Sequence, residues 1–114
     1  MTSFRVAFAA VMGDDGVTLV TLAFEASDPG RLVAALARYV VLSRAHEGCR
    51  NIDLCHSATN PERFVIIEKW ASPTAQRAHL DSPEFVSLAQ ACDGLLSKPP
   101  DIDLLDGVSA HDLA

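Results

Sequence analysis

The fold is decided by a stretch that reads Arg63-Phe-Val-Ile-Ile-Glu-Lys-Trp70. Its residues are apolar on both faces of an extended chain, which is typical of a strand in the centre of a sheet. A turn-forming segment, Thr59-Asn-Pro-Glu62, precedes this strand. Before the turn, residues 49–57 form another predicted strand, with Ile52 and Leu54 on one face. This part of the chain therefore predicts two strands of one sheet.

Three dipeptides on either side of this stretch mark the starts of helices. Asp28-Pro29, Ser72-Pro73 and Ser82-Pro83 each place a capping side chain before a proline at the first helical position. The predicted buried face of the first helix follows helical spacing and comprises Leu32, Leu36, Tyr39, Val40 and Ser43. Gly48 offers a left-handed end after this helix. The last helix is predicted to end at Pro99-Pro100 and to present the stripe Phe85, Leu88, Ala89, Cys92 and Leu96.

The remaining segments complete one domain of 114 residues with a core at 17–105. Residues 17–26 and 101–105 are predicted strands, residues 1–12 an extra strand or an arm, and residues 109–114 a frayed tail. The order strand, helix, strand, strand, helix, strand is the split βαββαβ pattern of a ferredoxin-like α+β fold, with both helices on one face. The other face has no plainly polar side, so we expect a second copy to cover it and form a homodimer.

Charge and hydropathy exclude several classes of partner. The chain has 9 Lys and Arg against 15 Asp and Glu, a net charge of −6 without a basic cluster, so no nucleic-acid partner is expected. The apolar run Phe4–Val11 is too short for a membrane span and is poorly suited to a secretion signal. We therefore expect no membrane partner and a cytoplasmic location, in which Cys49, Cys55 and Cys92 stay reduced.

The usual sequence signatures of cofactor sites are absent. The four histidines, His46, His56, His79 and His111, show no HxxxH or similar spacing, so no metal site is predicted. Neither a GxGxxG nor a Walker pattern occurs, which disfavours a nucleotide cofactor. We expect a protein that works without a cofactor.

The chain resembles the antibiotic biosynthesis monooxygenase superfamily, including its quinol monooxygenase-like proteins, in Glu47-Gly-Cys49, Phe64-Val-Ile-Ile-Glu-Lys-Trp70, His79 and Ser82-Pro-Glu-Phe85. The resemblance covers about residues 17–105. It implies a dimeric α+β barrel of ferredoxin-like protomers, with a pocket between sheet and helices in each protomer. Several members of the superfamily oxidise polycyclic phenols or quinols with molecular oxygen and without metal or flavin.

Two departures from the superfamily's patterns narrow what the resemblance implies. Haem-degrading relatives carry an asparagine in the first strand and a histidine in the last helix, whereas residues 17–26 contain no Asn and residues 85–96 no His. A phenol-oxidising subgroup has an asparagine where this chain has Ile66. We therefore expect no haem breakdown, but a monooxygenase-like enzyme that oxidises a small aromatic phenol or quinol with molecular oxygen.

Three side chains are the candidate catalytic residues. His79 fits a base for the phenol proton because imidazole titrates near neutrality. Trp70 offers a flat wall for an aromatic ring and an N–H group for a developing oxyanion. Glu68, on the same strand face, would orient or polarise its neighbours. The candidate substrate-binding residues are Phe64, Ile66, Tyr39, Phe85 and His56.

Two other functions stay open at the level of sequence. The missing asparagine at Ile66 is consistent with a non-catalytic protein that binds a hydrophobic metabolite. A small carbonyl compound could also be isomerised, with His79 moving a proton between adjacent carbons.

Overall fold

The computed structural model describes residues 16–110 and 112, so the strand or arm expected at residues 1–12 lies outside the described residues. The elements are β1 (Thr18–Glu25), α2 (Pro29–Ser43), β2 (Cys49–His56), β3 (Arg63–Trp70), α3 (Pro73–Leu80), α4 (Pro83–Ala91) and β4 (Asp101–Asp106). Their order matches the predicted α+β pattern, with the second helical segment divided into α3 and α4.

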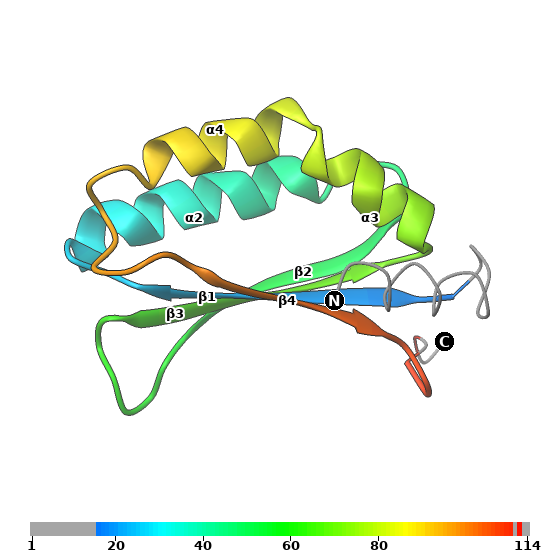
Figure 1. Ribbon diagram of the computed structural model, residues 1–114, viewed down its shortest axis with the longest axis horizontal. Helices are drawn as coiled ribbons and strands as arrows, with labels where there is room; N and C mark the ends of the chain where they lie inside the picture. The colour runs from blue at the N-terminus through cyan, green and yellow to red at the C-terminus, as the bar shows by residue number, and fades with distance from the viewer. Residues whose placement is uncertain (1–15, 111, 113–114) are drawn as a thin grey trace.

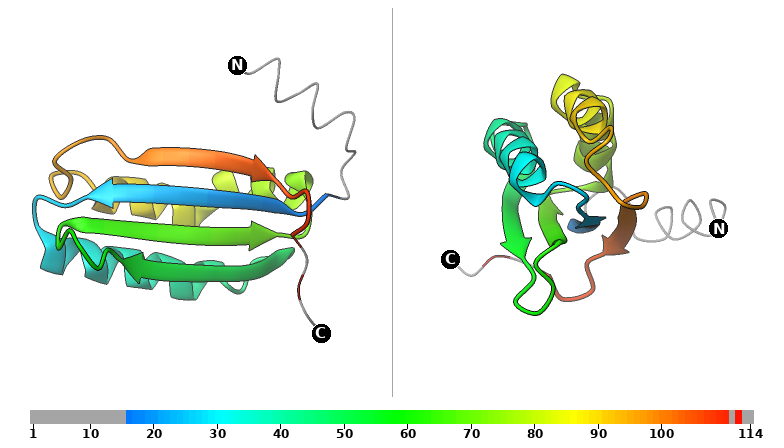
Figure 2. Two further views of the ribbon diagram at one scale, coloured as in Figure 1. Left: turned by 90° about the horizontal axis from the view of Figure 1, so that it is seen from below. Right: turned by 90° about the vertical axis from the view of Figure 1, so that its left-hand side faces the viewer.

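The four strands form one antiparallel sheet in the order β2-β3-β1-β4. The apolar strand β3 lies inside the sheet, as its sequence predicts. The three helices of the described residues pack on one face of the sheet (Figure 1), and none of them lies on the opposite face when the molecule is seen from below (Figure 2, left). The ferredoxin-like fold is therefore confirmed. Over the described ranges, no helix is long and apolar enough to cross a bilayer.

The predicted caps start the helices. The side chain of Asp28 accepts a hydrogen bond from the Arg31 backbone N–H, at 3.3 Å. Ser72 Oγ accepts from the backbone N–H of Ala75 at 3.1 Å, and Ser82 Oγ accepts from that of Phe85 at 3.2 Å. These caps satisfy amides that have no partner within the helix. They also fix the starts of α3 and α4, and with them the positions of His79 and Phe85.

The core lies between the helices and the inner face of the sheet. Strand β1 alternates, with Val20, Leu22 and Phe24 buried and their neighbours half-exposed. The buried residues of α2 are the predicted ones, Leu32, Leu36, Tyr39, Val40 and Ser43. In β3 the inner-face residues are Phe64, Ile66, Glu68 and Trp70. A carboxylate thus lies on the face of the sheet that packs against the helices.

The end of α4 differs from its prediction. The helix stops at Ala91 and does not reach Pro99-Pro100, because Gly94 takes a left-handed backbone with φ +77°. The N–H of Leu95 donates to the Cys92 carbonyl across this turn, at 2.9 Å. Leu95 is consequently the buried residue after the turn, whereas Leu96, predicted on the helical stripe, is half-buried. A glycine in this conformation carries no steric cost, so it ended the helix before the prolines could.

Two glycines with positive φ provide a matched stability prediction. A Cβ added at Gly48, with φ +82°, would lie 2.5 Å from Ala75 Cβ in α3, whereas one added at Gly94 would meet nothing within 4 Å. We expect Gly94→Ala to lower the free energy of unfolding by about 1–2 kcal/mol through its left-handed backbone alone. Gly48→Ala should cost clearly more, since α3 must also move. Urea unfolding of both variants measures the difference, and equal losses would show that α3 does not press on Gly48.

Candidate active site

Four aromatic and ionisable side chains meet beneath the helices. Glu68 and Trp70 extend from the inner face of β3, His79 comes from α3, and Tyr39 comes from α2. Their exposed fractions are 2%, 0%, 1% and 2%. The structure therefore brings together the three predicted catalytic residues and adds Tyr39, which the sequence predicted as a substrate contact.

The Tyr39 hydroxyl joins the two ionisable groups. It forms a hydrogen bond with Oε2 of Glu68 and another, of 2.7 Å, with Nε2 of His79. The indole N–H of Trp70 donates to the second carboxylate oxygen, Oε1 of Glu68, at 3.0 Å. Each oxygen of the buried carboxylate thus has a partner, as burial of a charge requires. We call these four residues the Tyr39 network.

The imidazole of His79 is surrounded by rings. Its centroid lies 4.6 Å from that of Trp70, with the planes tilted by 32°, and 5.0 Å from that of His46, nearly edge-on. Nε2 of His46 in turn lies 3.0 Å from Oε2 of Glu84. Among the described residues, none hydrogen-bonds to Nδ1 of His79, although this atom is buried. A buried nitrogen without a partner is uncommon, and a catalytic role is one reason for which such a group persists.

Burial dominates the protonation of the network. It lowers the pKa of His79 to about 4, with a further contribution from His46, so the imidazole is neutral at neutral pH. Burial raises the pKa of the Glu68 carboxyl, although hydrogen bonds from Tyr39 and Trp70 oppose the shift. Burial and the nearby charge of Glu68 raise the pKa of the Tyr39 phenol, so its hydroxyl keeps its proton. The network therefore disfavours every buried charge.

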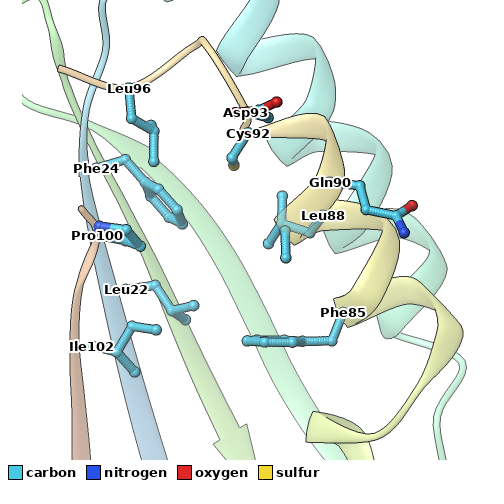
Figure 3. A pocket seen from close by; sticks show the side chains of 11 residues that line it. Leu22, Phe24, Phe85, Leu88, Gln90, Cys92, Asp93, Leu96, Pro100 and Ile102 are labelled. Carbon is cyan, nitrogen blue, oxygen red and sulfur yellow. The ribbon is translucent and has the colours of Figure 1, made fainter. Parts of the chain in front are cut away.

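An apolar cavity of about 620 Å³ lies beside the network, between α4 and the strands β1 and β4. Its walls are mainly carbon, and the side chains from the sheet and from α4 face one another across it (Figure 3). The lining residues are Leu22, Phe24, Phe85, Leu88, Ala89, Gln90, Cys92, Asp93, Leu96, Pro100 and Ile102. Small-molecule sites in proteins occupy about 300–1,000 Å³, so this cavity has room for a small aromatic molecule.

Phe85 is shared by the cavity and the network. Its ring projects into the cavity from α4 (Figure 3), and its centroid lies 6.1 Å from that of His79 and 6.2 Å from that of Tyr39. His79, Glu68 and Trp70 do not themselves line the cavity. Tyr39 contributes to a separate depression of about 230 Å³ between α2 and α4. The phenylalanine thus forms a wall between the apolar space and the imidazole.

The other predicted substrate contacts lie elsewhere on the inner face. Ile66 is fully buried in the sheet between Leu22 and Leu54. Phe64 is buried and stacks on the exposed ring of His56, with centroids 4.6 Å apart. His56 Nε2 also lies 2.8 Å from the Pro61 carbonyl oxygen. Ile66, Phe64 and His56 are not among the residues that line the cavity. Of the predicted substrate contacts, Phe85 lines it.

Sequence reasoning overlooked most of the cavity wall. Leu88, Ala89, Cys92 and Leu96 belong to the predicted stripe of the last helix, and this stripe was the signal that could have found them. No spacing in the sequence indicates the contact of His46 with His79. Across residues 16–110 and 112, no group of three or more His, Cys, Asp or Glu side chains is arranged to hold a metal ion.

Comparisons with known proteins point to one family. The family model described as "Antibiotic biosynthesis monooxygenase" matches residues 19–91, from the second residue of β1 to the end of α4. A protein of Mycobacterium tuberculosis named "Putative monooxygenase Rv0793" is 32% identical over 74 residues, which span 65% of this chain and 72% of that protein. The family-model match to residues 19–91 contains the whole of the Tyr39 network.

Solved structures show the same architecture. The structure of Rv0793 from Mycobacterium tuberculosis superposes with a TM-score of 0.76 at 26% identity, covering 84% of this chain and 99% of that one. A structure from Caulobacter crescentus, titled as a putative antibiotic biosynthesis monooxygenase, gives a TM-score of 0.78 at 19% identity. It covers 90% of this chain and 99% of that one, and at this identity it shows the fold alone.

Proposed function

The chain belongs to the antibiotic biosynthesis monooxygenase family, and on that premise we propose that it oxidises a small aromatic phenol or quinol with molecular oxygen, without metal or flavin. The observation that carries this proposal is the pairing of an apolar cavity of about 620 Å³ with a buried, hydrogen-bonded base next to it. An apolar cavity suits a flat, largely apolar substrate, and the base suits an acidic O–H group on it.

Oxygenation of this kind depends on the substrate's own electrons. Loss of the hydroxyl proton gives a phenolate, which is electron-rich enough to reduce oxygen. For a quinol, one oxygen atom then enters the ring to give a hydroxyquinone and the other leaves as water, so the substrate supplies every electron. The protein has to accept the proton, hold the ring and exclude water. The low exposure of His79 and its neighbours meets the last requirement.

His79 is the proposed proton acceptor, and Phe85 controls its contact with substrate. The imidazole is neutral at neutral pH, and its buried Nδ1 has no hydrogen-bond partner in the part of the chain that the structure describes, so it can accept a proton. Since Phe85 separates this ring from the cavity, we propose that its side chain rotates aside when a substrate ring enters. Trp70, 4.6 Å from the imidazole, would then face the bound ring.

Oxygen uptake tests the proposed reaction. Purified protein is mixed with a panel of hydroquinones and naphthols, and oxygen consumption is recorded beside a His79→Ala variant. We expect the wild type to consume oxygen with at least one compound and the variant to consume no more than a protein-free control. A Val41→Ala variant, changed at an exposed site on α2, should match the wild type. Equal uptake by wild type and His79→Ala would contradict the proposal.

We also propose that two copies pack through the face of the sheet opposite α2, α3 and α4. This face carries the apolar side chains of Leu19, Ala23, Val65, Ile67 and Leu105, which alternate with the buried inner residues. Ile67 and Leu105 are 39% and 41% exposed. An apolar patch of this kind at the centre of a sheet is costly to leave in water and fits its own copy.

A charge at the centre of this face should separate the copies. We expect Ile67→Lys to lower the molar mass in light scattering from that of a dimer to that of a monomer. Desolvating an ammonium between the two apolar faces costs more than its attraction to Asp53, directly opposite on β2, can offset. Val41→Lys, on the outer side of α2, is the matched control and should leave the mass unchanged. A wild-type protein that is monomeric at high concentration would refute the proposed dimer.

A cytoplasmic location goes with this proposal. Cys49, Cys55 and Cys92 are all free thiols in the structure. Free thiols persist where the surroundings are reducing, and the cytoplasm is such a compartment.

A second candidate function is binding without turnover. The observation in its favour is that His79, Glu68 and Trp70 lie behind Phe85 and do not line the cavity. A hydrophobic metabolite could then fill the apolar space without meeting the base. Native mass spectrometry of freshly purified protein, with retained mass but no oxygen uptake, would support binding, and an empty protein with no affinity for the same compounds would count against it.

A further inference from the structure

We infer that Tyr39 conducts the substrate's proton from His79 to Glu68, so that the carboxylate and not the imidazole holds the proton after the substrate is ionised. The inference rests on the proposed function for the identity of the proton donor. It assigns Tyr39 as a positioning and relay residue, and it gives Glu68 a chemical role within the site.

The hydrogen bonds around Tyr39 have the form of a relay. The hydroxyl has one proton but two close partners, Nε2 of His79 at 2.7 Å and Oε2 of Glu68. It must therefore donate to one and accept from the other. With Glu68 ionised, Tyr39 donates to the carboxylate and the imidazole carries its proton on Nε2, which leaves Nδ1 as a bare acceptor. That is also the ring atom without a partner among the described residues.

The transfer then has three linked movements. A proton from the substrate hydroxyl binds Nδ1 of His79, the Nε2 proton moves to the Tyr39 oxygen, and the former Tyr39 proton moves to Oε2 of Glu68. The imidazole ends neutral with its proton on Nδ1, the tyrosine is restored and Glu68 is a neutral carboxyl. One negative charge has passed from Glu68 to the substrate. This is the charge that the substrate needs to reduce oxygen.

Burial favours the carboxylate as the final acceptor. A proton kept on His79 would leave an imidazolium and a carboxylate both buried, whereas a proton on Glu68 leaves both groups neutral. The pKa values agree, since burial lowers that of His79 to about 4 and raises that of Glu68 above its usual value. The other ionisable groups facing the network are His46 after α2, Glu84 in α4 and Cys49 in β2. His46 and Glu84 bond to each other, at 3.0 Å.

Trp70 orients the carboxylate of Glu68, which is the proposed final acceptor of the proton. Its indole N–H donates to Oε1 of Glu68 at 3.0 Å and so fixes the rotation of the carboxylate. The remaining oxygen, Oε2, is thereby directed at the Tyr39 hydroxyl. Proton transfer along hydrogen bonds requires this alignment, because a carboxylate that rotates freely spends little time in line with its donor.

The relay predicts a change of tautomer that can be seen without substrate. In ¹⁵N NMR of the wild type, acidification should move the His79 proton from Nε2 to Nδ1 while the ring stays neutral, as Glu68 becomes protonated. The infrared band of a protonated carboxyl should appear over the same pH range. In Tyr39→Phe the ring packing is kept and the hydroxyl is lost, so the tautomer change should disappear. Glu68→Gln should also abolish it and remove the infrared band.

Controls and turnover complete the experiment. Cys49→Ala changes a neutral neighbour of the network and should titrate like the wild type. In oxygen uptake, Tyr39→Phe should keep substrate affinity and lose at least about tenfold in kcat. An imidazolium in the wild type with an ionised Glu68, or a tautomer change that persists in Tyr39→Phe, would overturn the relay. A normal tautomer change with no oxygen uptake would instead leave the relay standing and refute the proposed reaction.

Discussion

Trp70→Ala is expected to lower the free energy of unfolding by about 3–5 kcal/mol, the usual range for removing a fully buried aromatic side chain. The indole is completely buried, packs on His79 at 4.6 Å and donates to Glu68 at 3.0 Å. Its loss therefore opens a cavity and also leaves a carboxylate oxygen buried without a donor. Urea unfolding followed by circular dichroism measures the loss, since Trp70 is the only tryptophan and its fluorescence disappears with it.

Trp70→Phe separates the cost of the cavity from the cost of the lost N–H donor. Phenylalanine keeps most of the apolar volume and removes the N–H group, so we expect a smaller loss, of about 1–3 kcal/mol, from the unsatisfied oxygen of Glu68. If Glu68 is mainly protonated in the folded protein, the loss should fall towards the lower value. A cost below about 1 kcal/mol for Trp70→Ala would mean that the network does not support the core as its burial indicates.

The fold could be predicted because local signals and the global arrangement agree. Residues 63–70 are apolar on both faces, and the strand they form lies inside the sheet. Ser72 and Ser82 cap helices at the expected positions. Each of these signals acts within a few residues of the chain, so a sequence is enough to read it. The end of α4 was misplaced because the left-handed Gly94 was passed over in favour of two later prolines.

The site could be predicted only in part because the residues that meet in it are distant from one another in the sequence. Strand parity placed Glu68 and Trp70 on one face, and helical spacing placed Tyr39 on the buried side of α2. No local rule states that a hydroxyl 29 residues before Glu68 and 40 before His79 lies between them. The same holds for Phe85, whose helical stripe predicts a buried position but not that its ring separates the cavity from the imidazole.

Acid should destabilise the protein through His79. In the unfolded chain this imidazole titrates near 6.5, whereas burial lowers its pKa to about 4 in the folded protein. Between these values the unfolded chain binds a proton that the folded protein does not, so the free energy of unfolding falls as the pH is lowered from 6.5 to 4. The difference corresponds to about 3 kcal/mol, fully available above pH 6.5 and lost below pH 4.

Glu68 changes the free energy of unfolding with pH in the opposite direction to His79. Its contribution therefore has to be removed before that of His79 can be measured. Its pKa is raised on folding, so its own contribution to stability is present at low pH and is lost as the pH rises through its folded pKa. We therefore compare Glu68→Gln with the double variant Glu68→Gln, His79→Gln by urea unfolding between pH 7 and pH 4. Only the single variant should lose about 3 kcal/mol relative to the double variant on acidification. Parallel curves would show that the pKa of His79 stays at its ordinary value in the folded protein. Burial would then not be what keeps the imidazole neutral and able to accept a proton.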